Sequence, residues 1–479
     1  MQRKSFAEAA RPFVQRIPFG TGLIKQLYHH FKVAQFKARH TLRRKLGGGG
    51  YANPETVYWI NPDRILNVTN LDAPANETAA QQRLERQIAS QDFHERVFDR
   101  DRDKGKVVGG DWDKSDLDFK DLEIYAALEQ RIRDRTPWQE TNFYNTVNKR
   151  IYEGESLWNC RTSEDLNARC EYQDQLIASI REKGYQLNSD VLLPGEKPDS
   201  GAKNPYLSSE ILVNIGRNGE YLFQDGRHRL AISQILGIKS IPVKVLVRHE
   251  EWQALRDHLA LSVKNISDAR KSSVLYQTPI HPDLFDFPGT HSCEDRFEIL
   301  QPFMLNRSGN FLDVGANLGY FCHKAEELGF DCFAIERLPR VAWAASRIRD
   351  AEGKKFAIYE GEPWSALESE LLEGKSFDTV NALNILHHSL ESEQEYGALI
   401  RFLEQLSVEQ MFLETHKEDA LHRQGAYANM EPDEFVNFII EHTELTDYER
   451  LGNAHDGRLM FRLFKSDLEA GAGPASTLV

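Results

Sequence analysis

Short apolar runs alternate with longer stretches of helical hydrophobic spacing through the last third of the chain, from about residue 290 to residue 466. Each run has the length of a buried strand, and each intervening stretch is long enough for a helix that returns the chain to the same edge of a sheet. This alternation predicts an α/β fold, a parallel sheet with helices on both faces. The five runs are 311–314, 331–335, 356–359, 377–383 and 410–414.

Two further strands are expected after the fifth run, at 444–451 and 459–464. Only Asn453-Ala-His-Asp-Gly457 separates their cores, which is too short for a helical crossover. The two strands should therefore form a hairpin, so that the final strand runs antiparallel to the others. A seven-stranded sheet results.

The end of the first run carries a glycine turn. After Val314 come Gly315, Asn317 and Gly319, and then a stretch with helical spacing. Glycine allows the backbone to approach a ligand closely, and the N-terminus of the following helix offers unpaired N–H groups. The second run ends in Glu336, at the position where an acidic side chain holds a ribose diol. The pattern predicts a pocket for a nucleotide or nucleoside.

The stretch Asp313-x-Gly315-x-Asn317-x-Gly319 resembles motif I of class I S-adenosylmethionine-dependent methyltransferases, with Asn in place of the middle Gly. Glu336 matches the ribose-binding acid of that family, and residues 377–388 are similar to its fourth strand and the loop beneath the methyl group. The dehydrogenase fingerprint G-x-G-x-x-G is absent. The resemblance covers roughly 290–466 and implies a Rossmann-like sheet with S-adenosyl-L-methionine as cofactor.

The resemblance also implies roles for individual residues. Histidines at the mouth of the pocket could remove a proton from an acceptor, or could simply cap the end of the strand. A second acid–base pair would be Glu414 and His416, and Glu362 could equally be a solvent-exposed residue. The expected cofactor-binding residues are Asp313, Gly315, Asn317, Gly319, Glu336, Glu362 and Asn381, and the expected catalytic residues are His388, His387 and Asn384.

A second pattern lies near the middle of the chain. Two apolar strands flank the turn Gly216-Arg-Asn-Gly219, and a helix and another strand, 241–247, follow them. The helix begins at Asp225-Gly226, and three basic residues, Arg227, His228 and Arg229, occupy its first turn. Cations at a helix N-terminus oppose the helix dipole, and a bound phosphate would offset that cost. The alternative is that the two arginines pair with nearby acids.

The box Gly226-x-His228-Arg229 resembles that of the ParB/sulfiredoxin-like superfamily, which binds nucleotide phosphates. The similarity covers roughly 190–250 and implies a smaller α+β domain with a nucleoside triphosphate or diphosphate at Asp225, Gly226, Arg227, His228 and Arg229. Position 227 is Arg, so the catalytic cysteine of the reductases is missing, and no helix-turn-helix follows as it does in partition proteins.

The remaining chain is organised around these two units. Residues 1–46 are strongly basic, which favours contact with an anionic membrane or an acidic partner, or packing on the protein's own acidic body. In the bridging stretch 251–300, we expect either an acceptor lid or a packed linker, formed by Tyr276, His281, Phe285 and His291. The expected division is 1–50 basic arm and Gly linker, 51–185 mixed, mostly helical region with short strands at 57–60 and 65–68, 186–250 ParB/sulfiredoxin-like nucleotide-binding domain, 251–290 linker or lid, 291–466 methyltransferase domain and 467–479 tail.

Composition limits the function classes. The chain has 479 residues and a net charge of -14, which argues against a surface that coats nucleic acid. Its five cysteines form no C-x-x-C pair, so we expect reduced thiols in a cytoplasmic protein and no metal site. We predict methyl transfer to an O or N acceptor on a small molecule or saccharide. The alternative is a nucleotide-binding regulatory or scaffolding protein, or a ParB-like small-molecule kinase, whose methyltransferase fold is not catalytic.

Overall fold

The computed structural model describes residues 51–69, 98, 103–158, 160–187, 210–270, 275–291, 293–305, 307–415 and 426–466, with the backbone alone over 263–270. The predictions for the basic arm 1–46, the glycine linker 47–50, His416 and the tail 467–479 lie outside these residues. In the described part of the chain, no helix is both long and apolar enough to cross a bilayer. All five cysteines are buried and free.

The N-terminal half forms a mixed six-stranded sheet with the order β1-β6-β4-β5-β2, and β3 pairs with β6. The predicted hairpin is present, because β4 and β5 are antiparallel and joined at Gly216–Gly219. Helix α8 then carries the chain across to β6, which runs parallel to β4. The strands are β1 (Val57–Ile60), β2 (Ile65–Val68), β3 (Lys106–Val108), β4 (Ile211–Ile215), β5 (Tyr221–Asp225) and β6 (Ile241–His249).

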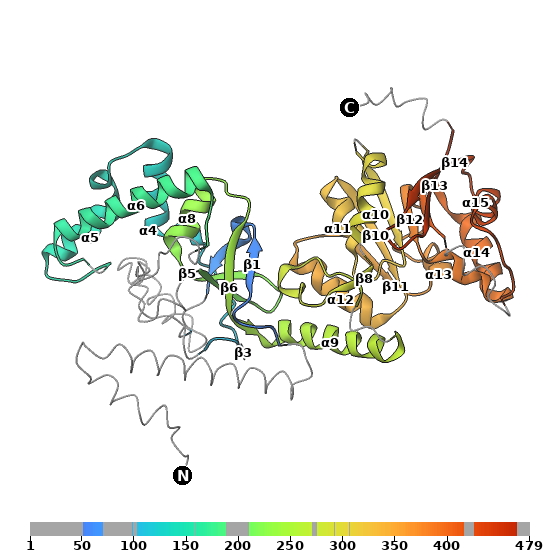
Figure 1. Ribbon diagram of the computed structural model, residues 1–479, viewed down its shortest axis with the longest axis horizontal. Helices are drawn as coiled ribbons and strands as arrows, with labels where there is room; N and C mark the ends of the chain where they lie inside the picture. Colours follow the sequence, from blue (N-terminus) through green and yellow to red (C-terminus); the bar gives the residue numbers. More distant parts are fainter. Residues whose placement is uncertain are drawn as a thin grey trace, which may run out of the picture.

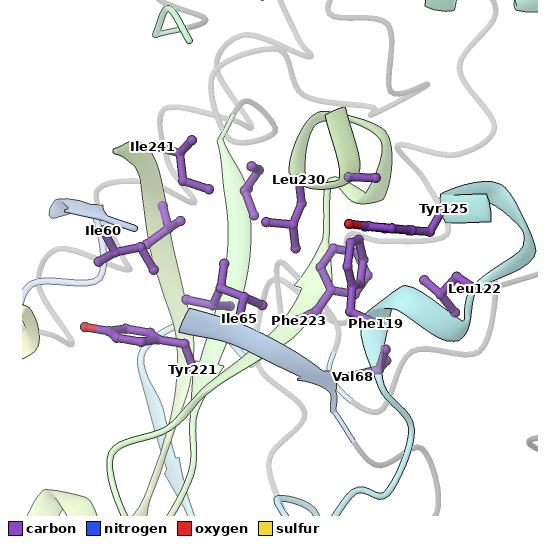
Figure 2. Close-up of a cluster of buried hydrophobic side chains, with 14 of the residues drawn as sticks. Ile60, Ile65, Val68, Phe119, Leu122, Tyr125, Tyr221, Phe223, Leu230 and Ile241 are labelled. Carbon is purple, nitrogen blue, oxygen red and sulfur yellow. The ribbon is translucent and has the colours of Figure 1, made fainter. Parts of the chain in front are cut away.

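Helices cover this sheet, and one hydrophobic core joins them to it (Figure 1). Figure 2 shows part of the core, in which Ile65 and Val68 from β2 and Phe119 from η2 lie with Phe223 from β5 and Leu230 from α8. The helical elements are η1 (Pro62–Arg64), η2 (Phe119–Asp121), α4 (Glu123–Glu129), η3 (Gln130–Asp134), η4 (Trp138–Glu140), α5 (Asn142–Tyr152), α6 (Ser163–Lys183) and α8 (Arg227–Ile235).

The division expected at residues 185 and 186 does not separate two folding units in this structure. The short strands expected at 57–60 and 65–68 are present as β1 and β2, and together with β3 they share a sheet with β4, β5 and β6. The reason is that β4 to β6 expose edges and a face that their own short segment cannot cover, and the earlier strands and helices bury them. Residues 51–249 therefore contribute to one sheet and one core.

The C-terminal half forms the predicted seven-stranded sheet, with the order β11-β10-β9-β12-β13-β15-β14. The first five strands in sequence are parallel, and β15 is antiparallel to both β13 and β14, as expected from the short connection between the last two strands. The strands are β9 (Gly309–Val314), β10 (Phe330–Glu336), β11 (Ala357–Glu360), β12 (Ser376–Leu383), β13 (Ser407–Glu414), β14 (Asp447–Asn453) and β15 (Leu459–Phe464).

Two hydrophobic cores lie against this sheet. One contains residues of α10 and α11, and the other contains residues of α14 and α15, so the sheet is covered on both faces. Helix α13, in the stretch between β11 and β12, is short and ends at Ala366. The helical elements are α10 (Cys293–Leu300), η6 (Gln301–Phe303), α11 (Tyr320–Glu327), α12 (Pro339–Ala351), α13 (Pro363–Ala366), η7 (Leu386–Leu390), α14 (Glu393–Gln405) and α15 (Pro432–Glu441).

The linker between the two sheets consists of α9 (Glu250–Arg270), η5 (Pro282–Leu284) and a parallel two-stranded ribbon of β7 (Leu275–Gln277) and β8 (Gly289–His291). In Figure 1, α9 runs from the N-terminal sheet toward the C-terminal domain. Helix α12 contacts α9, and its residues Ala344 and Ile348 belong to the N-terminal core. The two halves therefore share packed surface.

Candidate functional site

The candidate site lies where the strand order of the C-terminal sheet reverses. From β9 the chain proceeds outward through β10 to β11, and it then returns to place β12 on the other side of β9. The loops that follow β9 and β12 leave the sheet in opposite directions at this point, which opens a crevice outside the carboxyl ends of the strands. All the predicted cofactor-binding residues lie near or after the carboxyl ends of strands β9 to β12.

The loop after β9 adopts the tight turn that the glycines predicted. Gly315, Asn317 and Gly319 all have positive φ, at 79°, 52° and 81°. A Cβ at Gly315 would lie 3.1 Å from the side chain of Ile385, whereas one at Gly319 would lie 2.9 Å from the ring of Phe356. Gly315 thus allows Ile385 of the loop after β12 to pack directly against the turn, while Gly319 allows the ring of Phe356 to pack against the start of α11.

Asp313 lies under this turn and is buried. Its Oδ1 accepts a hydrogen bond of 2.7 Å from Nδ2 of Asn381, which stands at the paired position on β12. Burial raises the pKa of Asp313 to about 7; the hydrogen bond from Asn381 opposes this rise, and the nearby carboxylate of Glu336 adds to it. Asp313 and Asn381 therefore form one buried polar pair across adjacent strands.

Glu336 ends β10 and is also buried. One carboxylate oxygen accepts a hydrogen bond of 2.9 Å from the N–H of Asn317, and the other accepts one of 2.8 Å from the N–H of Leu338. Burial raises the pKa of this carboxyl, against the effect of these backbone hydrogen bonds. The side chain is held beside the turn, as expected for the acid that follows the second strand.

Two acceptor atoms of the site are buried without a donor among the described residues, namely Oδ2 of Asp313 and Oδ1 of Asn381. A buried acceptor without a partner costs roughly 1–3 kcal/mol. A ligand that carries N–H or O–H donors and a positive charge would satisfy both acceptors and would favour the ionised form of Asp313. The composition of the site thus suits a cationic, donor-rich ligand.

Glu362 differs from the other predicted cofactor residues. It precedes α13, its side chain is exposed, and its carboxylate lies 3.9 Å from the guanidinium of Arg337. An exposed pair at this distance contributes little to stability. Contact of Glu362 with an adenine ring stays a prediction.

The three predicted catalytic residues lie in different surroundings after β12. Asn384 has φ 57°, and its Nδ2 donates a hydrogen bond to the hydroxyl of Tyr276. His387 is buried in η7, whereas the side chain of His388 is half exposed and its Nδ1 lies 3.6 Å from a carboxylate oxygen of Glu391. The two imidazole rings are 4.4 Å apart. Of the two histidines, His388 is the one accessible from solvent.

The linker contributes two residues to this site. Tyr276 contacts Asn384, and Oε1 of Gln277 accepts a hydrogen bond of 3.1 Å from the N–H of Leu318 in the glycine turn. Tyr276 is among the residues expected for a lid, whereas Gln277 is not identified from the sequence. Its only sequence signal is that it neighbours Tyr276, because a hydrogen bond between residues 41 positions apart leaves no local pattern.

The other residues expected near a lid divide between the two halves of the molecule. The ring of His291 lies 4.5 Å from that of Tyr276, beside the candidate site. His281 is instead buried in the N-terminal half, where it stacks on Tyr221, and burial lowers its pKa to about 3. Phe285 is exposed. The linker is therefore packed at His281 and reaches the site at Tyr276 and His291.

A buried ion-pair network lies at the end of the neighbouring strand. Glu414 ends β13, and its carboxylate is bound by the guanidinium of Arg296 from α10 at 2.6 Å. Arg296 also contacts Asp456 at 3.1 Å, and Asp456 lies 3.5 Å from Nδ1 of His291. The sequence suggests Glu414 as an acid–base residue. In the structure its carboxylate is paired with Arg296, and this ion pair anchors α10 to the end of β13.

The predicted phosphate site in the N-terminal half lies at the start of α8. Gly226 has φ 96° and forms the N-cap, as the sequence indicated. The ring of His228 stacks on that of Trp158 at 5.1 Å, and burial together with the neighbouring arginines holds the pKa of His228 well below its ordinary value. His228 is thus neutral, which corrects the expectation of three cations in this turn. The cationic groups there are Arg227 and Arg229.

Among known proteins, similarity to this chain is found in solved structures alone. No protein-family model matches the sequence. No curated protein matches it either. Among solved structures, the bifunctional kinase-methyltransferase WbdD shares 18% identity over 42% of this chain and 45% of its own, with a TM-score of 0.34. This chain therefore spans less than half the length of WbdD.

Two smaller proteins are matched over nearly their whole length. The N-methyltransferase NodS from Bradyrhizobium japonicum WM9 shares 15% identity over 36% of this chain and 95% of its own, with a TM-score of 0.27. The N-terminal domain of EvdMO1, solved with SAH bound, shares 10% identity over 42% of this chain and 95% of its own, with a TM-score of 0.31. At these values the assignment of a methyltransferase-like fold rests on the strand order and the antiparallel β15.

Proposed function

We propose that the chain is an S-adenosylmethionine-dependent methyltransferase that acts on an O or N acceptor of a small molecule or saccharide. The observation that carries this proposal is the pair of buried acids, Asp313 and Glu336, on adjacent parallel strands with the glycine turn between them. S-adenosylmethionine brings an ammonium group, a sulfonium, ribose hydroxyls and an adenine amine. This set provides the positive charge and the donors that the buried acceptors of the site lack.

The residues of the chain divide the work of binding. Asp313 and Asn381 would receive donors of the methionine end, Glu336 would accept from the ribose hydroxyls, and Gly315 would let the backbone of the turn approach the ligand closely. When bound, the cofactor supplies a methyl group already activated by its sulfonium. The protein therefore needs only to align the acceptor and exclude water.

His388 is the residue we propose as base for the proton of the acceptor. Its side chain is accessible, and the carboxylate of Glu391 at 3.6 Å would stabilise the imidazolium that forms. His387 is buried against it and would support its orientation. Asn384 would face the reacting groups from the end of β12.

The function can be tested by untargeted metabolite profiling with a labelled methyl donor. Wild type should form a labelled product, and Gly315→Arg should not, because the new side chain would collide with Ile385 and force the turn and the loop after β12 apart. Gly154→Arg is a matched control, since Gly154 also has positive φ (91°) but no atom lies within 4 Å of the point that its Cβ would occupy. Equal labelling by wild type and Gly315→Arg would refute the proposed reaction.

For the N-terminal half we propose binding of a nucleotide or phosphorylated ligand at Asp225–Arg229. The N–H groups at the start of α8 and the guanidinium groups of Arg227 and Arg229 would receive the phosphate, while His228 would pack behind them. Calorimetric titration with CTP, ATP and ADP would test this site. If none of the three nucleotides binds, the proposed phosphate site is wrong.

A further inference from the structure

One short strand of the linker, β7, contacts both loops that enclose the candidate cofactor pocket. Gln277 contacts the turn after β9, and Tyr276 contacts the loop after β12. The two contacts come from adjacent residues, whose side chains extend to opposite sides of a strand. A three-residue strand thus contacts both the turn after β9 and the loop after β12.

The contact of Gln277 is buried. Its side chain is 4% exposed, and its Oε1 accepts the N–H of Leu318, which lies between the two positive-φ residues Asn317 and Gly319. This hydrogen bond fixes one peptide unit of the turn that Glu336 also holds through the N–H of Asn317. The turn is therefore fixed from two directions, by the sheet and by the linker.

The contact of Tyr276 lies on the acceptor side. Its hydroxyl oxygen accepts from Nδ2 of Asn384, and its ring lies against His291. Burial raises the pKa of Tyr276, so the side chain is a neutral phenol. Because the oxygen already accepts from Asn384, its hydroxyl hydrogen can donate to an oxygen or nitrogen of a methyl acceptor.

The ribbon itself is anchored to the N-terminal half. Leu275 is buried in the core that contains the N-terminal sheet, and Leu318 of the turn belongs to the same core. The hydroxyl of Thr290 donates to the carbonyl of Leu275 at 3.1 Å, and the N–H of Gly289 donates to the hydroxyl of Thr278 at 3.2 Å. Such packing on both sides gives β7 a defined position relative to the pocket.

We propose that β7 is a functional part of the site, in which Gln277 positions the cofactor-binding turn and Tyr276 positions Asn384 and contacts the methyl acceptor. This inference rests on the proposed methyltransferase function. It gives different roles to two residues outside the sheet domain. Gln277 determines the affinity for the cofactor, and Tyr276 determines the rate of methyl transfer.

The role of Gln277 is tested by calorimetric titration of the full chain with S-adenosylhomocysteine. Gln277→Leu leaves the N–H of Leu318 without its acceptor, and the dissociation constant should rise about tenfold. Gln277→Glu keeps an acceptor oxygen and should retain affinity near that of wild type. Gln234→Leu is the control, because Gln234 is a buried glutamine whose amide donates to the carbonyls of Pro62 and Ile65 in the N-terminal half.

The outcomes separate the two proposals. If wild type binds S-adenosylhomocysteine and Gln277→Leu binds it equally well, the positioning role is wrong and the proposed function stands. If Gln277→Leu and Gln234→Leu weaken binding equally, general destabilisation is the cause and the positioning role is again refuted. If wild type itself does not bind, the methyltransferase function fails first.

Tyr276→Phe tests the acceptor side, because it keeps the ring against His291 and removes only the hydroxyl. Its affinity for S-adenosylhomocysteine should equal that of wild type, while labelled product in the profiling experiment should fall by about tenfold, the effect of losing one hydrogen bond in the site. Unchanged product formation would exclude contact of Tyr276 with the acceptor. Lost cofactor affinity would show instead that Tyr276 supports the pocket and not transfer.

Discussion

If the proposed function is correct, the raised pKa of Asp313 should make binding of the cofactor depend on pH. Burial gives this carboxyl a pKa of about 7, so a large fraction of it is protonated below neutral pH in the protein without ligand. The ammonium group of the cofactor favours the carboxylate form. Binding below pH 7 must therefore displace a proton from Asp313, and affinity must fall as the pH falls.

The magnitude follows from the size of the shift. If the bound ligand returns the pKa of Asp313 to its ordinary range, the dissociation constant of S-adenosylhomocysteine should rise by about tenfold for each pH unit below 7, or about 30-fold at pH 5.5. Glu336, whose pKa is also raised by burial, acts in the same direction. Above pH 8 the dissociation constant should become constant.

Stability in the absence of ligand should change with pH as well. A carboxyl whose pKa is higher in the folded than in the unfolded protein destabilises the folded form as the pH rises, because only the unfolded chain ionises freely. Between pH 3.8 and about pH 7 the cost grows to about 4 kcal/mol, and it is constant above that range. Asp313→Asn removes this cost and keeps an oxygen that can accept from Asn381.

The assay is isothermal titration calorimetry with S-adenosylhomocysteine at several pH values, in two buffers of different ionisation enthalpy. Wild type should release close to one proton for each ligand bound at pH 6, and almost none at pH 8. Asp313→Asn should bind weakly, with a much flatter pH dependence and higher thermal stability than wild type at pH 8 without ligand. A flat profile for wild type, or equal slopes for both proteins, would refute the reasoning.

Three further substitutions test other parts of the structure. Glu336→Gln removes the charge that holds two backbone N–H groups and should weaken S-adenosylhomocysteine binding about 10- to 100-fold by calorimetry, and unchanged affinity would contradict the ribose-binding role. Gly219→Ala should lower the free energy of unfolding by about 2–4 kcal/mol, since its Cβ would overlap the side chains of Trp252 in α9 and Ala351 in α12. The control Gly154→Ala has a similar φ and open space, and should cost about 1–2 kcal/mol in the same denaturant titration. Arg296→Met leaves Glu414 buried without its cation and should cost about 3–5 kcal/mol, which a second substitution of that glutamate by Leu should largely restore.

Local sequence rules were sufficient for the C-terminal sheet and the turn at its centre. The apolar runs and their spacing predicted the parallel strands and the final hairpin, because strand length, crossover length and turn chemistry all act over a few residues. Gly315 and Gly319 predicted a glycine turn after the first strand, and both adopt positive φ there. Asp313 and Glu336 were placed at the same edge, since parallel strands end together.

Tertiary packing decided what the sequence could not indicate. The assignment of β1, β2 and β3 to the same sheet as β6 depends on which exposed edges meet, and no local pattern encodes that choice. The same holds for the neutral state of His228, which comes from burial against Trp158, a residue 70 positions earlier.

The turn after β9 and its contacts show most directly what the sequence determined and what the tertiary structure decided. The sequence by itself determined the turn after β9 and the acids beside it, because each is set by neighbours in the chain. Only the tertiary structure placed Asn381 on Asp313 and Gln277 on Leu318, because hydrogen bonds between distant residues form where packed surfaces bring them together. The chemistry of the site could therefore be predicted from single strands, but its support comes from a linker that has no pattern of its own.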